Sequence, residues 1–257
     1  MKVKKFILPL MAGVMLASCG GNSSASASGL SSQQTSASGL STSSSQSQTT
    51  FEPFTLSQVH DARVAKTLPS LENKTVSIKG KVTFAKVGES SDGVMTMQSG
   101  KYAIEVTCPE ASLAKVGDAI EVKGKFVGLY QGDVDTLWVS AYPDTIRDGS
   151  IKVIDEAINV EKVTILKEAD LVEYECSVAT VAFTVTGMRS SAAFVGKLTQ
   201  GDEEFIVANK LGISERFDEP PFAVGDKCKY EGVFGYTSNS QSRIFRYYDK
   251  NGFTPAN

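Results

Sequence analysis

The sequence contains very little of what enzymes commonly use for catalysis. It has one histidine, one tryptophan and four cysteines in 257 residues. No His/Cys cluster has the spacing of a zinc site, and no glycine-rich stretch has that of a phosphate-binding loop. His60 falls in a short polar segment, where we expect a solvated helix residue. Because hydrolysis needs a nucleophile with a base, paired carboxylates or a metal, we predict no catalytic residues, no metal and no cofactor, and that the chain is not an enzyme.

Long apolar runs are also missing. The run from Phe6 to Ala17 follows a basic start at Lys2, Lys4 and Lys5. It is too short to cross a hydrocarbon core of roughly 30 Å as a helix. No later stretch is apolar for the roughly 18 residues that a membrane-spanning helix needs. We therefore expect a targeting segment at the N-terminus and no transmembrane helix.

This segment ends in Leu16-Ala17-Ser18-Cys19, with Gly20 and Gly21 after it. The stretch resembles the lipobox of bacterial lipoproteins. The resemblance implies that residues 1–18 are a signal peptide and that Cys19 carries a diacylglyceryl group on its sulfur. It also implies a lipid-anchored protein on the extracytoplasmic face of the cell membrane, with membrane lipid as a partner; an ordinary secretory signal is the alternative.

Charge is absent from the next stretch. Between Asn22 and Thr50 there is no charged and no aromatic residue. Such a composition cannot bury enough apolar surface to offset the entropy of ordering, so we predict that residues 19–50 form a lipidated, serine-rich, disordered tether.

The expected loss of residues 1–18 also changes the net charge. It lowers the Lys and Arg count from 26 to 23 against 29 Asp and Glu, which gives a formal charge of −6. Strong non-specific binding of nucleic acid, which relies on basic residues, is therefore disfavoured.

From Phe51 onward the pattern is that of β-strands. Apolar and polar residues alternate after Val76, and hairpin signals follow. Thr55 or Ser57 is placed to cap a short helix before them. Short helices are also expected over 109–115 and 210–215. The same order returns about 100 residues later: Val116-Gly117-Asp118 recurs as Val224-Gly225-Asp226, each leading into a strand with a glycine at Gly124 or Gly232. Val82 matches Val181 in this comparison.

Each copy resembles an OB-fold of the tRNA-anticodon/helicase-type group, a five-stranded Greek-key barrel. The predicted fold is all-β, with two tandem OB-like barrels and short helices after a signal peptide and disordered tether. We assign residues 51–148 to the first OB-like domain and 149–257 to a linker and the second. Two β-sandwich domains are the alternative.

The resemblance also suggests where a ligand binds. OB barrels use strands 2 and 3 and the loops beside them, and arginines and aromatic rings suit single-stranded nucleic acid. The candidate ligand-binding residues on this basis are Tyr102, Tyr130, Trp138, Tyr236, Asn239, Arg243 and Phe245. For the last strand, the alternative is that one face simply fills the barrel. A disulfide between Cys176 and Cys228, or buried free thiols, are both compatible with the sequence.

Function is therefore predicted only as a class. The chain is a membrane-anchored lipoprotein with non-catalytic binding domains, and a protein-interaction or envelope-assembly module is preferred, with a protein partner in the envelope. The alternative is capture of single-stranded nucleic acid or another extended polymer, such as a polysaccharide, at the cell surface.

Overall fold

The structure, a computed structural model, describes residues 49–256 except positions 89, 132–133, 143–148, 191, 213–215, 220 and 239–241. These residues belong to one compact unit that spans Gln46–Asn257. The first repeat consists, in chain order, of β1 (Glu52–Phe54), α1 (Leu56–Val64), η1 (Leu68–Leu71), β2 (Thr75–Val87), β3 (Asp92–Ser99), β4 (Tyr102–Pro109), η2 (Glu110–Ser112), β5 (Ala119–Gln131), β6 (Val134–Ser140) and β7 (Ser150–Val153).

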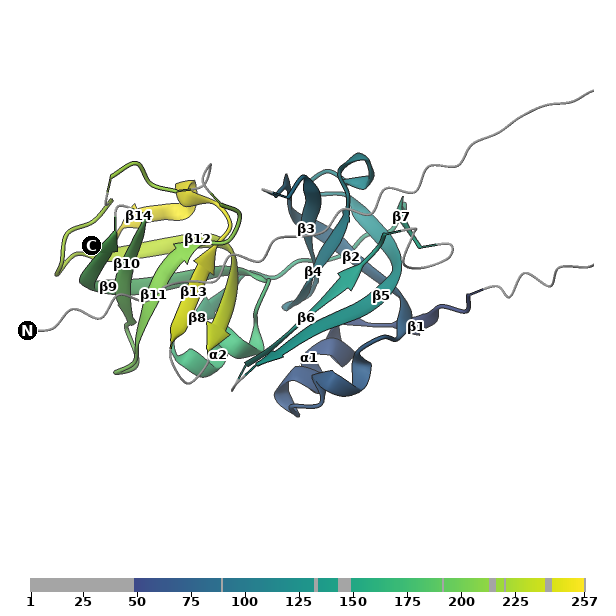
Figure 1. Cartoon of the computed structure of the whole chain (residues 1–257), viewed down its shortest axis with the longest axis horizontal. Helices are drawn as coiled ribbons and strands as arrows, with labels where there is room; N and C mark the ends of the chain where they lie inside the picture. The colour runs from purple at the N-terminus through teal and green to yellow at the C-terminus, as the bar shows by residue number, and fades with distance from the viewer. Residues whose placement is uncertain are drawn as a thin grey trace, which may run out of the picture. The chain divides into compact units, whose positions relative to one another are not determined.

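The second repeat consists of β8 (Val163–Ile165), α2 (Glu168–Glu173), β9 (Val178–Ser190), β10 (Ala193–Leu198), β11 (Glu204–Asn209), β12 (Lys227–Ser238), β13 (Arg243–Tyr247), η4 (Lys250–Gly252) and β14 (Phe253–Pro255). Figure 1 shows these elements along the chain. In the described part of the chain, no helix is long and apolar enough to span a membrane.

Both repeats form the same closed barrel. The first has the strand order β2-β3-β4-β6-β5 and closes through β2 and β5, with β4 and β6 parallel. The second has the order β9-β10-β11-β13-β12 and closes through β9 and β12, with β11 and β13 parallel. This is the connectivity of an OB-fold. The prediction of two tandem OB-like barrels is confirmed, and the β-sandwich alternative is excluded.

The two Val-Gly-Asp turns make identical contacts. Gly117 N–H donates to Val82 O, and Val82 N–H donates to Asp118 O, each at 2.9 Å. In the second barrel, Gly225 and Asp226 make the same two bonds with Val185, each at 2.8 Å. Val82 therefore corresponds to Val185, and its sequence match to Val181 was wrong by four residues. Both glycines have φ near +100°, a conformation that glycine adopts without strain.

Each barrel carries the same additions. A short strand, β1 or β8, pairs in parallel with the first barrel strand, and a helix follows it. A second short strand, β7 or β14, pairs with the fourth barrel strand. Residues 150–153 therefore extend the first barrel's sheet, and residues 163–165 extend the second's.

The predicted short helices are present only in part. Thr55 caps α1 as expected, since Gln58 N–H donates to Thr55 Oγ1 at 3.2 Å. The helix expected over 109–115 is a 3₁₀ turn at Glu110–Ser112. Lys210 to Gly212 is not helical, and residues 213–215 lie outside the described residues.

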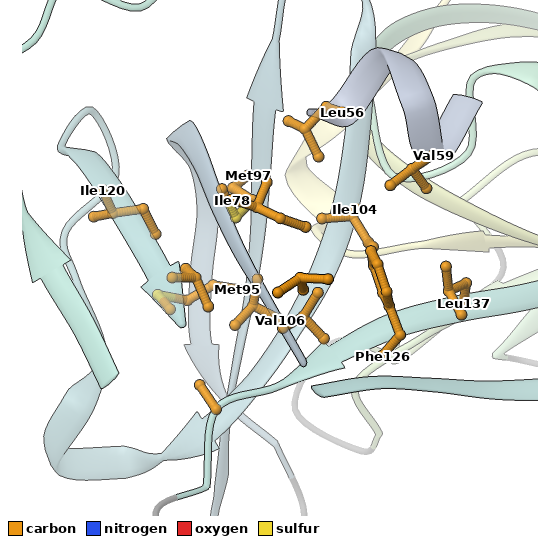
Figure 2. Close-up of a cluster of buried hydrophobic side chains, with 14 of the residues drawn as sticks. Leu56, Val59, Ile78, Met95, Met97, Ile104, Val106, Ile120, Phe126 and Leu137 are labelled. Atoms are coloured by element: carbon orange, nitrogen blue, oxygen red, sulfur yellow. The ribbon is translucent and has the colours of Figure 1, made fainter. Parts of the chain in front are cut away.

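The alternating pattern fills each barrel with apolar side chains. The first core contains aliphatic residues and methionines such as Ile78, Met95 and Ile104, with Leu56 and Val59 of α1 closing one end (Figure 2). The second core is rich in aromatic rings instead, among them Phe183, Phe205 and Phe245. The aromatic residues of the second copy are therefore mainly structural.

Candidate binding face

The usual ligand face of the first barrel is buried. Three polar residues of β3 and β4, Thr96, Gln98 and Glu105, alternate with core residues and so lie on the outer side of the barrel. Their exposed fractions are 0%, 0% and 9%. Polar side chains are rarely buried without partners, so another part of the chain must cover and bond this face.

The second barrel provides that cover. Val178 N–H donates to Gln98 Oε1 at 2.8 Å, and Ser177 Oγ donates to Lys101 O at 2.6 Å. The Gln98 amide in turn donates to Glu161 O at 2.7 Å. These bonds join β3 and the β3–β4 turn to the segments that lead into β8 and β9. The candidate face of barrel one is thus an intramolecular interface.

Glu105 receives two further partners from the second barrel. Tyr248 donates its hydroxyl hydrogen bond to the Glu105 carboxylate, and Lys210 Nζ lies 3.1 Å from it. Burial raises the pKa of Tyr248 well above its usual value, and the nearby Glu105 charge raises it further. Tyr248 therefore stays a hydrogen-bond donor. Its ring packs edge-on against Phe84 of the first barrel, with the centroids 5.0 Å apart.

A second buried carboxyl group, that of Glu175, lies near Arg63 of α1. Glu175 is 5% exposed and accepts a hydrogen bond from Tyr236 N–H at 3.4 Å. Burial raises the pKa of Glu175, and the positive charge of Arg63 partly opposes that rise. Arg63 is 6% exposed and donates through Nη1 to Glu173 O at 3.3 Å. Its Nε and Nη2 meet no acceptor among the described residues.

His60 belongs to the same region, which corrects the expectation of a solvated helix residue. Its side chain is 11% exposed. The ring centroid lies 4.1 Å from that of Tyr102 in the first barrel and 6.1 Å from that of Tyr174 in the second. Its nitrogens lie 3.3 Å from the carboxylates of Asp61 and Glu173. His60 therefore links α1 to the second repeat.

The equivalent face of the second barrel is open. Val195, Ile206 and Ile244 are paired in register across β10, β11 and β13, and each is only half-buried. They form an apolar row, which we call the open face. Lys197 lies opposite Glu204 at one side of the row. Among the described residues, no hydrogen bond or ion pair joins β10 or β11 to the first barrel.

Positive charge flanks the open face. Arg246 lies opposite Gly235, next to the apolar row, and forms no ion pair with a described residue. Arg189 is exposed at the end of β9. Lys197 is paired with Asp202 at 2.8 Å. The face thus combines aliphatic residues with one guanidinium group, that of Arg246, which pairs with no carboxylate among the described residues.

Two of the predicted ligand-binding aromatics lie in the core instead. Tyr236 is 1% exposed and donates its hydroxyl hydrogen bond to Glu168. Phe245 is 0% exposed and stacks on Phe234 with the centroids 5.4 Å apart. A ligand cannot stack on rings that the barrel already encloses. The structure thus agrees with the alternative in which this face of β13 fills the barrel.

The remaining predicted site residues are scattered. Arg243 is half-exposed, with Nε 2.8 Å from Glu168 and Nη1 3.1 Å from Glu203. Trp138 is half-buried on β6 of the first barrel, opposite Glu105. Tyr130 lies in β5 opposite Asp135, but its side chain is not among those described. Asn239 and Cys19 lie outside the described residues. The structure brings only Tyr236, Arg243 and Phe245 together, and they form part of the second barrel itself.

The disulfide between Cys176 and Cys228 is not formed. Both thiols are free and buried, as is that of Cys108. Cys228 is paired with Phe183 on β9, whereas Cys176 N–H donates to Phe234 O, six residues further along β12. At about 3.3 Å per strand residue this distance is far too long for a bond. Cys176 precedes β9 and has a φ of 69°, which accounts for its departure from the strand alternation.

Within the described residues, no group of three or more His, Cys, Asp or Glu is arranged to hold a metal ion. No protein-family model matches the chain, and no curated protein sequence matches it.

Several solved structures are similar to the chain. A murine DNA-binding protein bound to double-stranded DNA has 11% identity over 66% of this chain and 90% of its own, with a TM-score of 0.35. The tetrameric p202 HIN2 has 16% identity over 72% and 93%, with a TM-score of 0.34. A replication protein A heterotrimer bound to single-stranded DNA has 11% identity over 81% and 70%, with a TM-score of 0.25. The ligands named for those proteins are theirs alone. The OB-fold of this chain is shown by the strand pairing of its two barrels.

Proposed function

We propose that this chain is a non-catalytic binding protein, anchored to the cell membrane through Cys19, that holds a protein partner on the open face of its second barrel. The observation that carries the proposal is the difference between the two barrels. The first barrel's face is closed by hydrogen bonds from the second, whereas Val195, Ile206 and Ile244 leave the equivalent face half-exposed. Aliphatic surface with a charged rim is suited to a protein interface.

Single-stranded nucleic acid is the second candidate, because Arg246 lies beside the same face. Proteins of that class usually stack bases on exposed aromatic rings. The large aromatic residues of the second barrel, including Phe194, Phe205 and Phe245, are instead fully buried. Among the described residues of β10, β11 and β13, none that faces outward is aromatic. Protein binding therefore has the better support.

The test is site-specific photo-crosslinking in cells that carry the full-length anchored protein. A photoreactive phenylalanine at position 206 is expected to give a discrete protein adduct. The matched position is Val224, which is 62% exposed on a turn of the same barrel, and it should give none. Ile206→Asp, introduced with the crosslinker at position 195, should abolish the adduct. Equal adducts at 206 and 224 would contradict the proposal.

Two further measurements separate the alternatives. A fluorescent oligothymidine titrated at low salt should show no anisotropy change; salt-sensitive binding that Arg246→Ala removes would favour nucleic acid instead. Cys19→Ser should move the protein from the membrane fraction to the soluble fraction. Retention of the Cys19→Ser variant in membranes would argue against the lipid anchor.

A further inference from the structure

A separate cleft of about 730 Å³ opens on the first barrel. Its floor is the outer side of β2 and β5, including Ser77, Lys79 and Glu121. The chain that enters α1 and the segment 156–159, which leads to the second repeat, also line the cleft. The volume is within the usual range of small-molecule sites, roughly 300–1,000 Å³. The cleft uses none of the residues of the open face.

The wall formed by residues 154–159 is fixed mainly at its ends. Ile154 N–H donates to Ala119 O, and Gly100 N–H donates to Asn159 O, each at 2.9 Å. Between these ends, an ion pair joins Lys79 Nζ to Glu156 at 2.6 Å. A second hollow of about 670 Å³ lies along the same segment and shares residues 156–159 with the cleft. The segment therefore stands off the barrel and leaves room beside it.

Two aromatic rings of the cleft are held in place from behind. Tyr102 packs on His60 with the ring centroids 4.1 Å apart. Phe54 packs edge-on against Phe126 at 5.4 Å. Both Tyr102 and Phe54 remain half-buried rather than enclosed. Rings fixed in this way offer a flat apolar surface without a large loss of side-chain entropy on binding.

The polar part of the lining contains both donors and acceptors. Ser77 Oγ donates to Glu121 at 2.7 Å, which leaves the other carboxylate oxygen as an acceptor. Asn159 is exposed, and its side-chain amide makes no hydrogen bond to a described residue. The charged side chains that line the cleft are one cation, Lys79, and two carboxylates, Glu121 and Glu156. An anionic ligand would be repelled, whereas a neutral ligand with many hydroxyl groups can both donate to and accept from this lining.

We propose that this cleft binds a neutral oligosaccharide of two or three sugar rings. The C–H face of a sugar ring would pack on Tyr102 or Phe54, and its hydroxyl groups would bond to Glu121 and Asn159. A phosphate-linked strand is excluded from the same place by the two carboxylates. This goes beyond the proposed protein interaction, because it lies on the other barrel and does not depend on Ile206 or Arg246.

The test is saturation-transfer NMR with cellotriose, maltotriose and tri-N-acetylchitotriose, using the full-length protein in detergent. At least one trisaccharide should receive saturation, and its Kd should be measurable by calorimetry. Tyr102→Leu should weaken binding about tenfold, in the range of an aromatic contact. Asn159→Ala should weaken it about threefold to tenfold through the lost hydrogen bond. The matched control is Tyr142→Leu, an aromatic change at a half-buried position of the same barrel outside the cleft, which should leave the Kd unchanged.

Two results would overturn the proposal. One is the absence of saturation transfer from all three trisaccharides at millimolar concentration. The other is binding that neither Tyr102→Leu nor Asn159→Ala changes. Asn159 is exposed, so its variant should fold normally even where Tyr102→Leu does not. A failed crosslink at position 206 would leave these results unaffected, so the two proposals can fail independently.

Discussion

Lys210 of the second barrel places its ammonium group 3.1 Å from the Glu105 carboxylate of the first. Burial lowers the pKa of Lys210, but the charge and hydrogen bond of Glu105, together with the nearby buried acidic groups Cys176 and Glu175, outweigh burial, so that the pKa is raised overall. Lys210 therefore stays protonated at neutral pH and faces the Glu105 carboxylate. Glu105 is nearly buried. If Lys210 is removed, its carboxylate keeps the hydrogen bond from Tyr248 but loses its ion pair.

We expect Lys210→Met to lower the free energy of unfolding by about 2 kcal/mol, the usual cost of a buried charged group that loses a partner. Urea unfolding at pH 7 measures the change. Lys227→Met, on an exposed position of β12, is the control and should have little effect. Equal effects of the two variants would mean that the pair does not hold the barrels together.

Glu175 and Glu231 are expected to contribute to the pH dependence of the free energy of unfolding with opposite signs. Burial raises the pKa of Glu175 above its usual value, so the folded state binds the proton more tightly than the unfolded state. Glu175 therefore makes stability fall as pH rises from about 4.5, its unfolded pKa, through its folded pKa. Glu175→Gln should remove this slope, which for one proton is at most about 1.4 kcal/mol per pH unit.

Glu231 is the matched comparison. Hydrogen bonds from Lys229 and Lys162 lower its pKa to about 2. Its contribution is present above the unfolded pKa and is lost as pH falls toward the folded pKa. Glu231→Gln should therefore flatten the acid limb of the stability curve. Urea midpoints measured from pH 3 to 8 check both variants, and the same change of slope in both would contradict the assignment.

The three free thiols should be unreactive in the folded protein. Burial raises the pKa of Cys108 to about 11 and that of Cys228 to about 12, and it also raises the pKa of Cys176. Since the thiolate is the reactive form, iodoacetamide at pH 8 should modify none of them until the protein is unfolded. Mass spectrometry should then show three additions without prior reduction. Two fewer additions in the unreduced protein would indicate a disulfide.

Gly124 should not tolerate a side chain. A Cβ at this position would lie 2.4 Å from Val139 Cγ1 and 2.7 Å from Ser140 O. Gly124→Ala is therefore expected to cost about 2–3 kcal/mol through overpacking. At Gly88 the closest atom would be 3.6 Å away, so Gly88→Ala is the control and should be nearly neutral. Thermal melts of both variants test the difference.

Much of the fold could be predicted because local patterns determine it. Alternation placed Val76, Ile78 and Val122 inside, and the Val-Gly-Asp turns marked where the fourth strand of each barrel begins. The glycines at Gly124 and Gly232 recur at the same place in both of these strands. These features depend on residues close in sequence, which is why a single sequence reveals them.

The closed face of the first barrel could not be predicted in the same way. Gln98 and Glu105 have the alternation of ordinary outward residues on a half-buried strand. Their partners, Val178 and Tyr248, are 80 and 143 residues away. Nothing local distinguishes a polar residue that bonds to a second domain from one that bonds to water. His60 was misjudged for the same reason, because its ring partner Tyr174 belongs to the other repeat.

The parallel pairing of β1 with β2 has a mechanical consequence. Tension along the chain from its N-terminal side reaches Glu52–Phe54 before any barrel strand. Because β1 and β2 run parallel, pulling on β1 from its N-terminus acts along the strand and loads its hydrogen bonds together rather than one after another. The short pairing therefore takes up such tension first, before it reaches the pairing between β2 and β5 that closes the first barrel.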